Sequence, residues 1–174
     1  MATTAPTVVP FSSTSSSTFQ WNVFLSFRGE DTRDNFTSHL YAALVREGIQ
    51  TFKDDEGLRK GELISKALEK AIKGSKISII IFSRNYANSR WCLNELALIM
   101  EFWKKNGQKV IPVFLKGVDQ LDVQHQKESF GEAFGEHEKN FDPETVERWR
   151  STLRAAAQLS GWSSSDFRSL LPLR

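Results

Sequence analysis

The sequence predicts an α/β fold in which helices cover both faces of a parallel sheet. Short apolar runs alternate with amphipathic helical patterns from Asn22 onward. The runs at residues 77–82 and 110–115 are rich in Val and Ile, which is typical of parallel strands buried on both faces. A chain of 174 residues with 40% hydrophobic content is long enough to form one such domain around a single core.

The first elements follow from local signals. Residues 23–27 form an apolar strand, and Asp31 or Thr32 is expected to cap the next helix. The apolar residues that share one face of that helix are Phe36, Leu40, Ala43 and Leu44. Gly48 ends the helix, and residues 49–52 form a second, shorter strand.

A polar loop at residues 53–61 precedes the remaining elements. These are a helix that carries Ile64, Leu68 and Ile72, a strand at 77–82, a helix that begins near Trp91, a strand at 110–115 and a helix at 146–159. Between Lys116 and Val146 the periodicity weakens and no element is predicted. Gly161 ends the last helix, and Trp162 opens a short edge strand.

The first 20 residues differ from the rest in composition. They are rich in Ser and Thr, and no charged residue precedes Arg28, so we interpret residues 1–20 as a flexible tail. A plastid transit peptide is the less favoured alternative because it should carry arginines, and a secretory signal lacks support because a basic start and an apolar region are both missing. Residues 21–162 then form the domain and residues 163–174 a short extension.

Charge and cysteine content exclude several classes of protein. A net charge of +2 is too small to argue for a nucleic-acid or membrane partner. The single cysteine, Cys92, rules out an internal disulfide framework and suits a reducing compartment. No apolar run approaches the roughly 18 residues of a membrane span, so we expect a soluble chain.

Trp91 and Glu95 are the first candidate site residues. Four residues apart on a helix, they point to nearly the same side, whereas the residues expected on the core side are Leu93, Leu96, Ala97 and Met100. An exposed aromatic ring beside a carboxylate can stack a planar ligand and stabilise a developing positive charge. The alternative is an ordinary amphipathic helix with a partly buried tryptophan and a solvated glutamate.

Several motifs follow one another along the chain, at residues 24–33, Phe36, 38–41, 52–55, 80–83, 86–87, 89–96, 110–114 and 159–162. Together they resemble plant Toll/interleukin-1 receptor (TIR) domains, as found in TIR-class disease-resistance (NLR) proteins and TIR-only proteins. The resemblance implies a flavodoxin-like fold with five parallel strands in the order 2-1-3-4-5. In that order the loops after strands one and three meet at the topological switch point, where ligands bind.

Members of this family cleave the bond between nicotinamide and ribose in NAD+, and the resemblance implies that Glu95 is the catalytic residue. NAD+ or NADP+ is then the substrate, and neither a cofactor nor a metal is implied. By the same match Arg28 and Arg33 hold phosphate oxygens, and Trp91 stacks on a ring of the dinucleotide.

Each of these roles has a simpler alternative. Arg33 could pair with Glu30 or Asp34 at the surface. The resemblance implies that Gly29 lets the backbone approach the ligand closely, but this glycine could instead make a tight turn. The resemblance implies that Ser89 helps to orient the ligand. It could instead cap its helix, which is the more common use of serine at that position.

The resemblance also implies self-association, through two surfaces and a mobile loop at residues 54–61 that contacts a neighbouring subunit. One surface carries Lys127 and Glu128, where the family usually has Thr and Gly. The other pairs the helix carrying Ser38 and His39 with a last helix, of which residues 166–174 are a short remainder interrupted by Pro172. We therefore expect a largely monomeric chain whose activity rises when it is concentrated or recruited to another TIR protein.

Three classes of function remain open at this point. They are an NAD+-cleaving enzyme of plant innate immunity, a non-catalytic adaptor acting by TIR–TIR contacts, and a nucleotide-processing activity on RNA or DNA. The intact pair of Trp91 and Glu95 favours the enzyme over the adaptor, and the weak net charge disfavours nucleic acid. The expected location is cytoplasmic or nuclear, with no membrane partner.

Overall fold

The computed structural model describes residues 19–54 and 66–164 and contains the predicted parallel sheet. Its strands run in the order β2-β1-β3-β4-β5. Their bounds are β1 Trp21–Ser26, β2 Thr51–Lys53, β3 Ser75–Phe82, β4 Lys109–Phe114 and β5 Trp162–Ser163. Every neighbouring pair is parallel, which confirms the predicted fold class and strand order.

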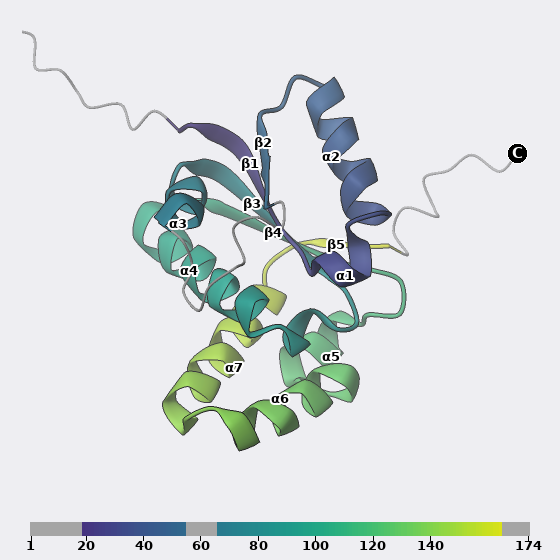
Figure 1. Cartoon of the computed structure of the whole chain (residues 1–174), viewed down its shortest axis with the longest axis vertical. Coiled ribbons are helices and arrows are strands. Elements are labelled where there is room, and N and C mark those ends of the chain that lie inside the picture. The colour runs from purple at the N-terminus through teal and green to yellow at the C-terminus, as the bar shows by residue number, and fades with distance from the viewer. Residues whose placement is uncertain (1–18, 55–65, 165–174) are drawn as a thin grey trace, which may run out of the picture.

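Helices lie on both sides of this sheet (Figure 1). Their bounds are α1 Gly29–Thr32, α2 Phe36–Arg46, α3 Lys66–Lys73, the 3₁₀ turn η2 Tyr86–Asn88, α4 Arg90–Asn106, α5 Gln120–His125, α6 Glu128–Asn140 and α7 Pro143–Ala157. α1 and α2 lie on one side of the sheet and α3 and α4 on the other, and α7 packs along α4.

The sheet separates two hydrophobic clusters of unequal size. The larger cluster joins α3, α4, α6 and α7 to the sheet and includes Trp149 and Tyr86. The smaller cluster, under α2, is built on Val23, Leu25, Phe27 and Ile81. Because burial of apolar surface is the main favourable term in folding, the side that carries α4 and α7 dominates stability.

Four predictions of local structure need correction. Asn35, not Asp31 or Thr32, caps α2, because its side chain accepts from the amide of Phe36. The second strand is Thr51–Lys53 rather than 49–52. The last long helix begins earlier than predicted, since Asp142 caps it and Pro143 occupies its first turn.

The fourth correction concerns residues 117–145, where no element was predicted. α5 and α6 lie there, and the buried residues of α6 are Phe130, Ala133, Phe134 and His137. Their spacing is that of an amphipathic helix. The signal was present, but two glycines and the high polarity of the segment concealed it.

Some predictions lie largely outside the described residues. These are most of the tail at 1–20, most of the extension at 163–174, the loop at 54–61 apart from Asp54, and the position of Ile64. Within the described ranges, no helix is both long and apolar enough to span a bilayer.

Candidate functional site

A cavity of about 460 Å³ lies at the predicted switch point, beyond the carboxyl ends of β1 and β3. α1 contributes Glu30 and Gly29, next to Arg28 at the end of the β1 loop. The start of α4 and the turn before it contribute Asn88, Ser89, Arg90 and Trp91, and the end of α6 contributes His137 and Phe141. Two motifs separated by about 60 residues of sequence thus share one cavity.

Four of the six predicted catalytic and substrate-binding residues line this cavity: Arg28, Gly29, Ser89 and Trp91. Arg33 and Glu95 are not among its lining residues. The lining residues that sequence reasoning missed are Glu30, Asn88, Arg90, His137 and Phe141. His137 and Phe141 lay in the segment where no helix was predicted, so nothing indicated that they approach Trp91.

Arg28 is held by two carboxylates. Its Nη2 lies 2.8 Å from Glu30 Oε2, and its Nη1 donates to Asp31 Oδ1 at 3.0 Å. Asp31 in turn accepts from Ser83 Oγ at 2.5 Å and from the backbone amide of Asn85 at 3.2 Å. Since Ser83 and Asn85 follow β3, the Asp31 carboxylate joins the loop after β1 to the loop after β3.

The surroundings of Asp31 alter its acidity. Burial raises its pKa, but the hydrogen bond from Ser83, the one from Asn85 and the charge of Arg28 together outweigh that effect. The net pKa of Asp31 is therefore lower than its usual value. The folded state favours the ionised carboxylate, which keeps the two loops joined at neutral pH.

Gly29 provides room for Arg33. A Cβ built on Gly29 would lie 2.2 Å from Arg33 Nη2, far inside van der Waals contact. The guanidinium of Arg33 also lies over the ring of Phe27, 6.0 Å from its centroid. A side chain at position 29 would therefore displace the guanidinium of Arg33.

Ser89 caps α4, because its Oγ accepts from the amide of Cys92 at 3.2 Å. Trp91 is half-buried in the cavity wall. Its Nε1 is buried and has no hydrogen-bond partner within the described part of the chain. A buried donor without an acceptor is costly, so this indole N–H leaves a hydrogen-bonding group unsatisfied beside the cavity.

Glu95 differs from the expectation of an exposed carboxylate. The residue is only 3% exposed, although Leu93, Leu96 and Met100 form the core side of α4 as predicted. Ala97 was expected on that side but is only partly buried. The sequence alone could not predict the burial of Glu95, because the residues that bury a polar side chain come from other segments of the chain.

His137 closes the cavity from the α6 side. Its Nε2 lies 2.7 Å from the carbonyl oxygen of Ala87, and a carbonyl only accepts, so we assign the proton to Nε2. Its ring packs edge-on against Trp149, with centroids 5.2 Å apart. The hydrogen bond to Ala87 fixes the end of α6 against the turn that leads to Trp91, and the ring contact joins it to α7.

The residues predicted to mediate self-association lie on the surface. Ser38 and His39 are exposed on α2, and Lys127 and Glu128 are exposed at the start of α6. Glu128 has φ 52°, in the left-handed region that favours glycine. The backbone at this position therefore suits glycine better than glutamate.

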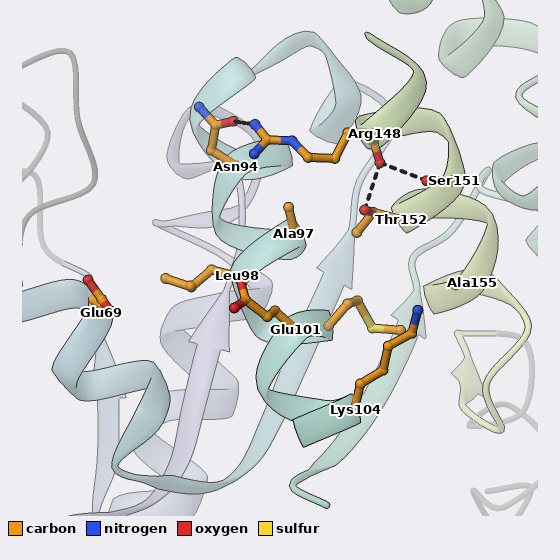
Figure 2. A pocket seen from close by; sticks show the side chains of 11 residues that line it. Glu69, Asn94, Ala97, Leu98, Glu101, Lys104, Arg148, Ser151, Thr152 and Ala155 are labelled. Carbon is orange, nitrogen blue, oxygen red and sulfur yellow. Dashed lines mark hydrogen bonds between the residues drawn. The ribbon is translucent and has the colours of Figure 1, made fainter. Parts of the chain in front are cut away.

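A larger groove, of about 710 Å³, lies between α4 and α7 (Figure 2). None of the predicted site residues lines it. Asn94 lies at its edge and accepts from Trp149 Nε1 at 2.9 Å and from Arg148 at 3.4 Å, which joins the two helices. We therefore place the functional site at the smaller cavity, where the predicted residues converge.

Among the residues that the structure describes, no group of three or more His, Cys, Asp or Glu side chains is placed to hold a metal ion.

The family model described as "TIR domain" matches residues 20–170. The chain belongs to the TIR-domain family. It is 55% identical over 151 residues to disease resistance protein RPV1 of Vitis rotundifolia, and 54% identical over 152 residues to TMV resistance protein N of Nicotiana glutinosa. These alignments cover 87% and 86% of this chain but only 11% and 13% of the relatives, so the chain corresponds to a small part of their length.

A solved structure agrees with this assignment. The TIR domains of the activated Roq1 resistosome, which directly recognizes the pathogen effector XopQ, superpose with a TM-score of 0.78 at 43% identity. The match covers 86% of this chain and 91% of the Roq1 chain. The TIR fold expected from the motifs is therefore confirmed at the level of the whole domain.

Proposed function

We propose that this TIR domain cleaves the nicotinamide–ribose bond of NAD+ or NADP+ in plant immune signalling. The observation that carries the proposal is the convergence of Arg28, Gly29, Ser89 and Trp91 on one cavity at the switch point, beside the helix of Glu95. The curated relatives are disease-resistance proteins, which supports the immune context.

The chemistry needs few protein groups. When the bond between ribose C1′ and the pyridinium nitrogen breaks, the electron pair leaves with nicotinamide, which becomes neutral and requires no general acid. The ribose acquires oxocarbenium character, as in glycoside hydrolysis, and water then adds to C1′ and loses a proton. Glu95 stabilises the positive charge, Trp91 stacks on a ring, and Arg28 binds a phosphate oxygen.

Burial of Glu95 sets a condition on this mechanism. A carboxylate that is 3% exposed is out of reach of a ribose, so the segments around it must move before reaction. Activity controlled by association satisfies this condition, because contacts with a second TIR domain supply free energy for the movement. We therefore propose that the chain is activated by self-association or by another TIR protein.

The same burial favours a second candidate function. A TIR domain whose Glu95 stays covered can still signal through contacts at its exposed residues, Ser38 and His39 on α2 and Lys127 and Glu128 at α6. This candidate is a non-catalytic adaptor.

Nicotinamide release from NAD+, measured over a wide range of protein concentrations, separates the two functions. The enzyme releases nicotinamide at a rate that rises faster than linearly with concentration. An adaptor releases none above the buffer control at any concentration, while light scattering still records its association.

A further inference from the structure

The two carboxylates that hold Arg28 differ sharply in exposure. The Glu30 side chain is 81% exposed, whereas that of Asp31 is 14% exposed. An exposed ion pair contributes little, because water and salt screen it and the side chains lose freedom. The bond from Arg28 Nη2 to Glu30 is therefore easily exchanged, and the bond from Nη1 to Asp31 is not.

Asp31 also fixes the opposite side of the cavity. Asn85 Nδ2 donates to Asp31 Oδ1 at 3.4 Å, and Asn85 Oδ1 accepts from Asn88 Nδ2 at 3.5 Å. Arg28 and Asn88 both line the cavity. The Asp31 carboxylate thus positions residues on both sides, whereas the Glu30 carboxylate contacts Arg28 alone among the described ion pairs.

Glu30 adds negative charge where an anionic ligand would bind. The charged lining residues other than histidine are Arg28, Arg90 and Glu30, which gives two positive charges and one negative charge, a net +1. A phosphate that approaches Arg28 meets the Glu30 carboxylate already on Nη2. Since like charges at close range repel, the two anions compete for one guanidinium nitrogen.

We propose that Glu30 is an internal competitor of the ligand: its carboxylate occupies Arg28 until a ligand phosphate replaces it. The proposal rests on the proposed function, which supplies a ligand with phosphates. Binding exchanges the Glu30 carboxylate for a phosphate oxygen on Nη2, while Asp31 keeps Nη1 and holds the guanidinium in place. Glu30 thereby lowers the affinity of the cavity for ligands that bind Arg28 through a phosphate.

The test measures the dissociation constants of ADP-ribose and of inorganic pyrophosphate by calorimetry with the whole chain. Glu30→Gln raises the net charge of the lining from +1 to +2 and should tighten both ligands about two- to fivefold, less so at high salt. Asp31→Asn should weaken both, because Arg28 and Asn88 lose their common partner. Glu47→Gln, an exposed change of equal charge at the far end of α2, should change neither.

Unchanged or weaker binding by Glu30→Gln would overturn the proposal, as would an equal gain from Glu47→Gln, which would show an effect of total charge. If Asp31→Asn does not fold, Glu30→Lys takes its place and should tighten binding beyond Glu30→Gln. The proposed role of Glu30 and the proposed cleavage activity are tested by separate results. The predicted order of dissociation constants without nicotinamide release would refute the enzyme and retain the role of Glu30, whereas release with unchanged constants would refute the role of Glu30 alone.

Discussion

Replacing Glu128 with glycine changes both the backbone strain and the charge at a predicted contact surface. Glu128 lies at φ 52°, a conformation that costs a residue with a Cβ about 1–2 kcal/mol and costs glycine almost nothing. Glycine loses about 0.5–1 kcal/mol of this gain through its greater freedom in the unfolded chain. The free energy of unfolding should therefore rise by about 0.5–1 kcal/mol, and the melting midpoint by about 1–4 °C.

Glu128→Gln is the matched control, because it removes the charge and keeps the strained backbone. Its melting midpoint should stay close to that of the wild type, as for most surface substitutions. Both variants should associate more strongly by light scattering, since a carboxylate no longer has to be desolvated in the contact. Equal melting midpoints for the two variants would refute the strain argument. Unchanged scattering for both at every concentration would refute the contact.

Three further predictions concern the cavity. Trp91→Ala should lower kcat/KM for NAD+ by the equivalent of about 1–3 kcal/mol, the value of a stacked ring, whereas Trp91→Phe should keep most of the wild-type kcat/KM. A large fall in the melting midpoint with unchanged kcat/KM would instead indicate that Trp91 is a core residue. Asp31→Asn should lower the melting midpoint at pH 7, because a carboxyl with a lowered pKa stabilises the fold while it is ionised. The difference should start to shrink as the pH falls below about 4 and should be lost as the pH falls through the lowered pKa of the folded state; a difference that stays constant as the protein is acidified would contradict this. Gly29→Ala should displace Arg33 and raise KM, and this effect should disappear in an Arg33→Ala background; additive effects would show that the two residues are independent.

The sheet and its order could be predicted because the apolar runs and the family motifs are local. Strand β3, for example, is a dense run of Ile whose burial follows from composition alone. α6 also had a local signal in the spacing of Phe130, Ala133, Phe134 and His137, but the glycines and polar residues between them weakened it.

Other features depend on contacts between distant segments and had no local signal. Asp31 was interpreted only as a helix cap, because its bond to Ser83 crosses 52 residues and exists only once β1 and β3 are neighbours. The burial of Glu95 likewise reflects the segments packed over α4 rather than the helical pattern itself. An amphipathic pattern predicts poorly which polar residues bridge two loops or are buried by distant segments.

Nicotinamide release by Glu95→Gln tests the central claim most directly. The control is Glu101→Gln, an isosteric change at an exposed position on the same helix. With folding verified and protein concentrated enough for wild-type activity, Glu95→Gln should release nicotinamide on the order of 10² to 10³ times more slowly, and Glu101→Gln at the wild-type rate. A folded Glu95→Gln variant that is as active as Glu101→Gln would contradict the account.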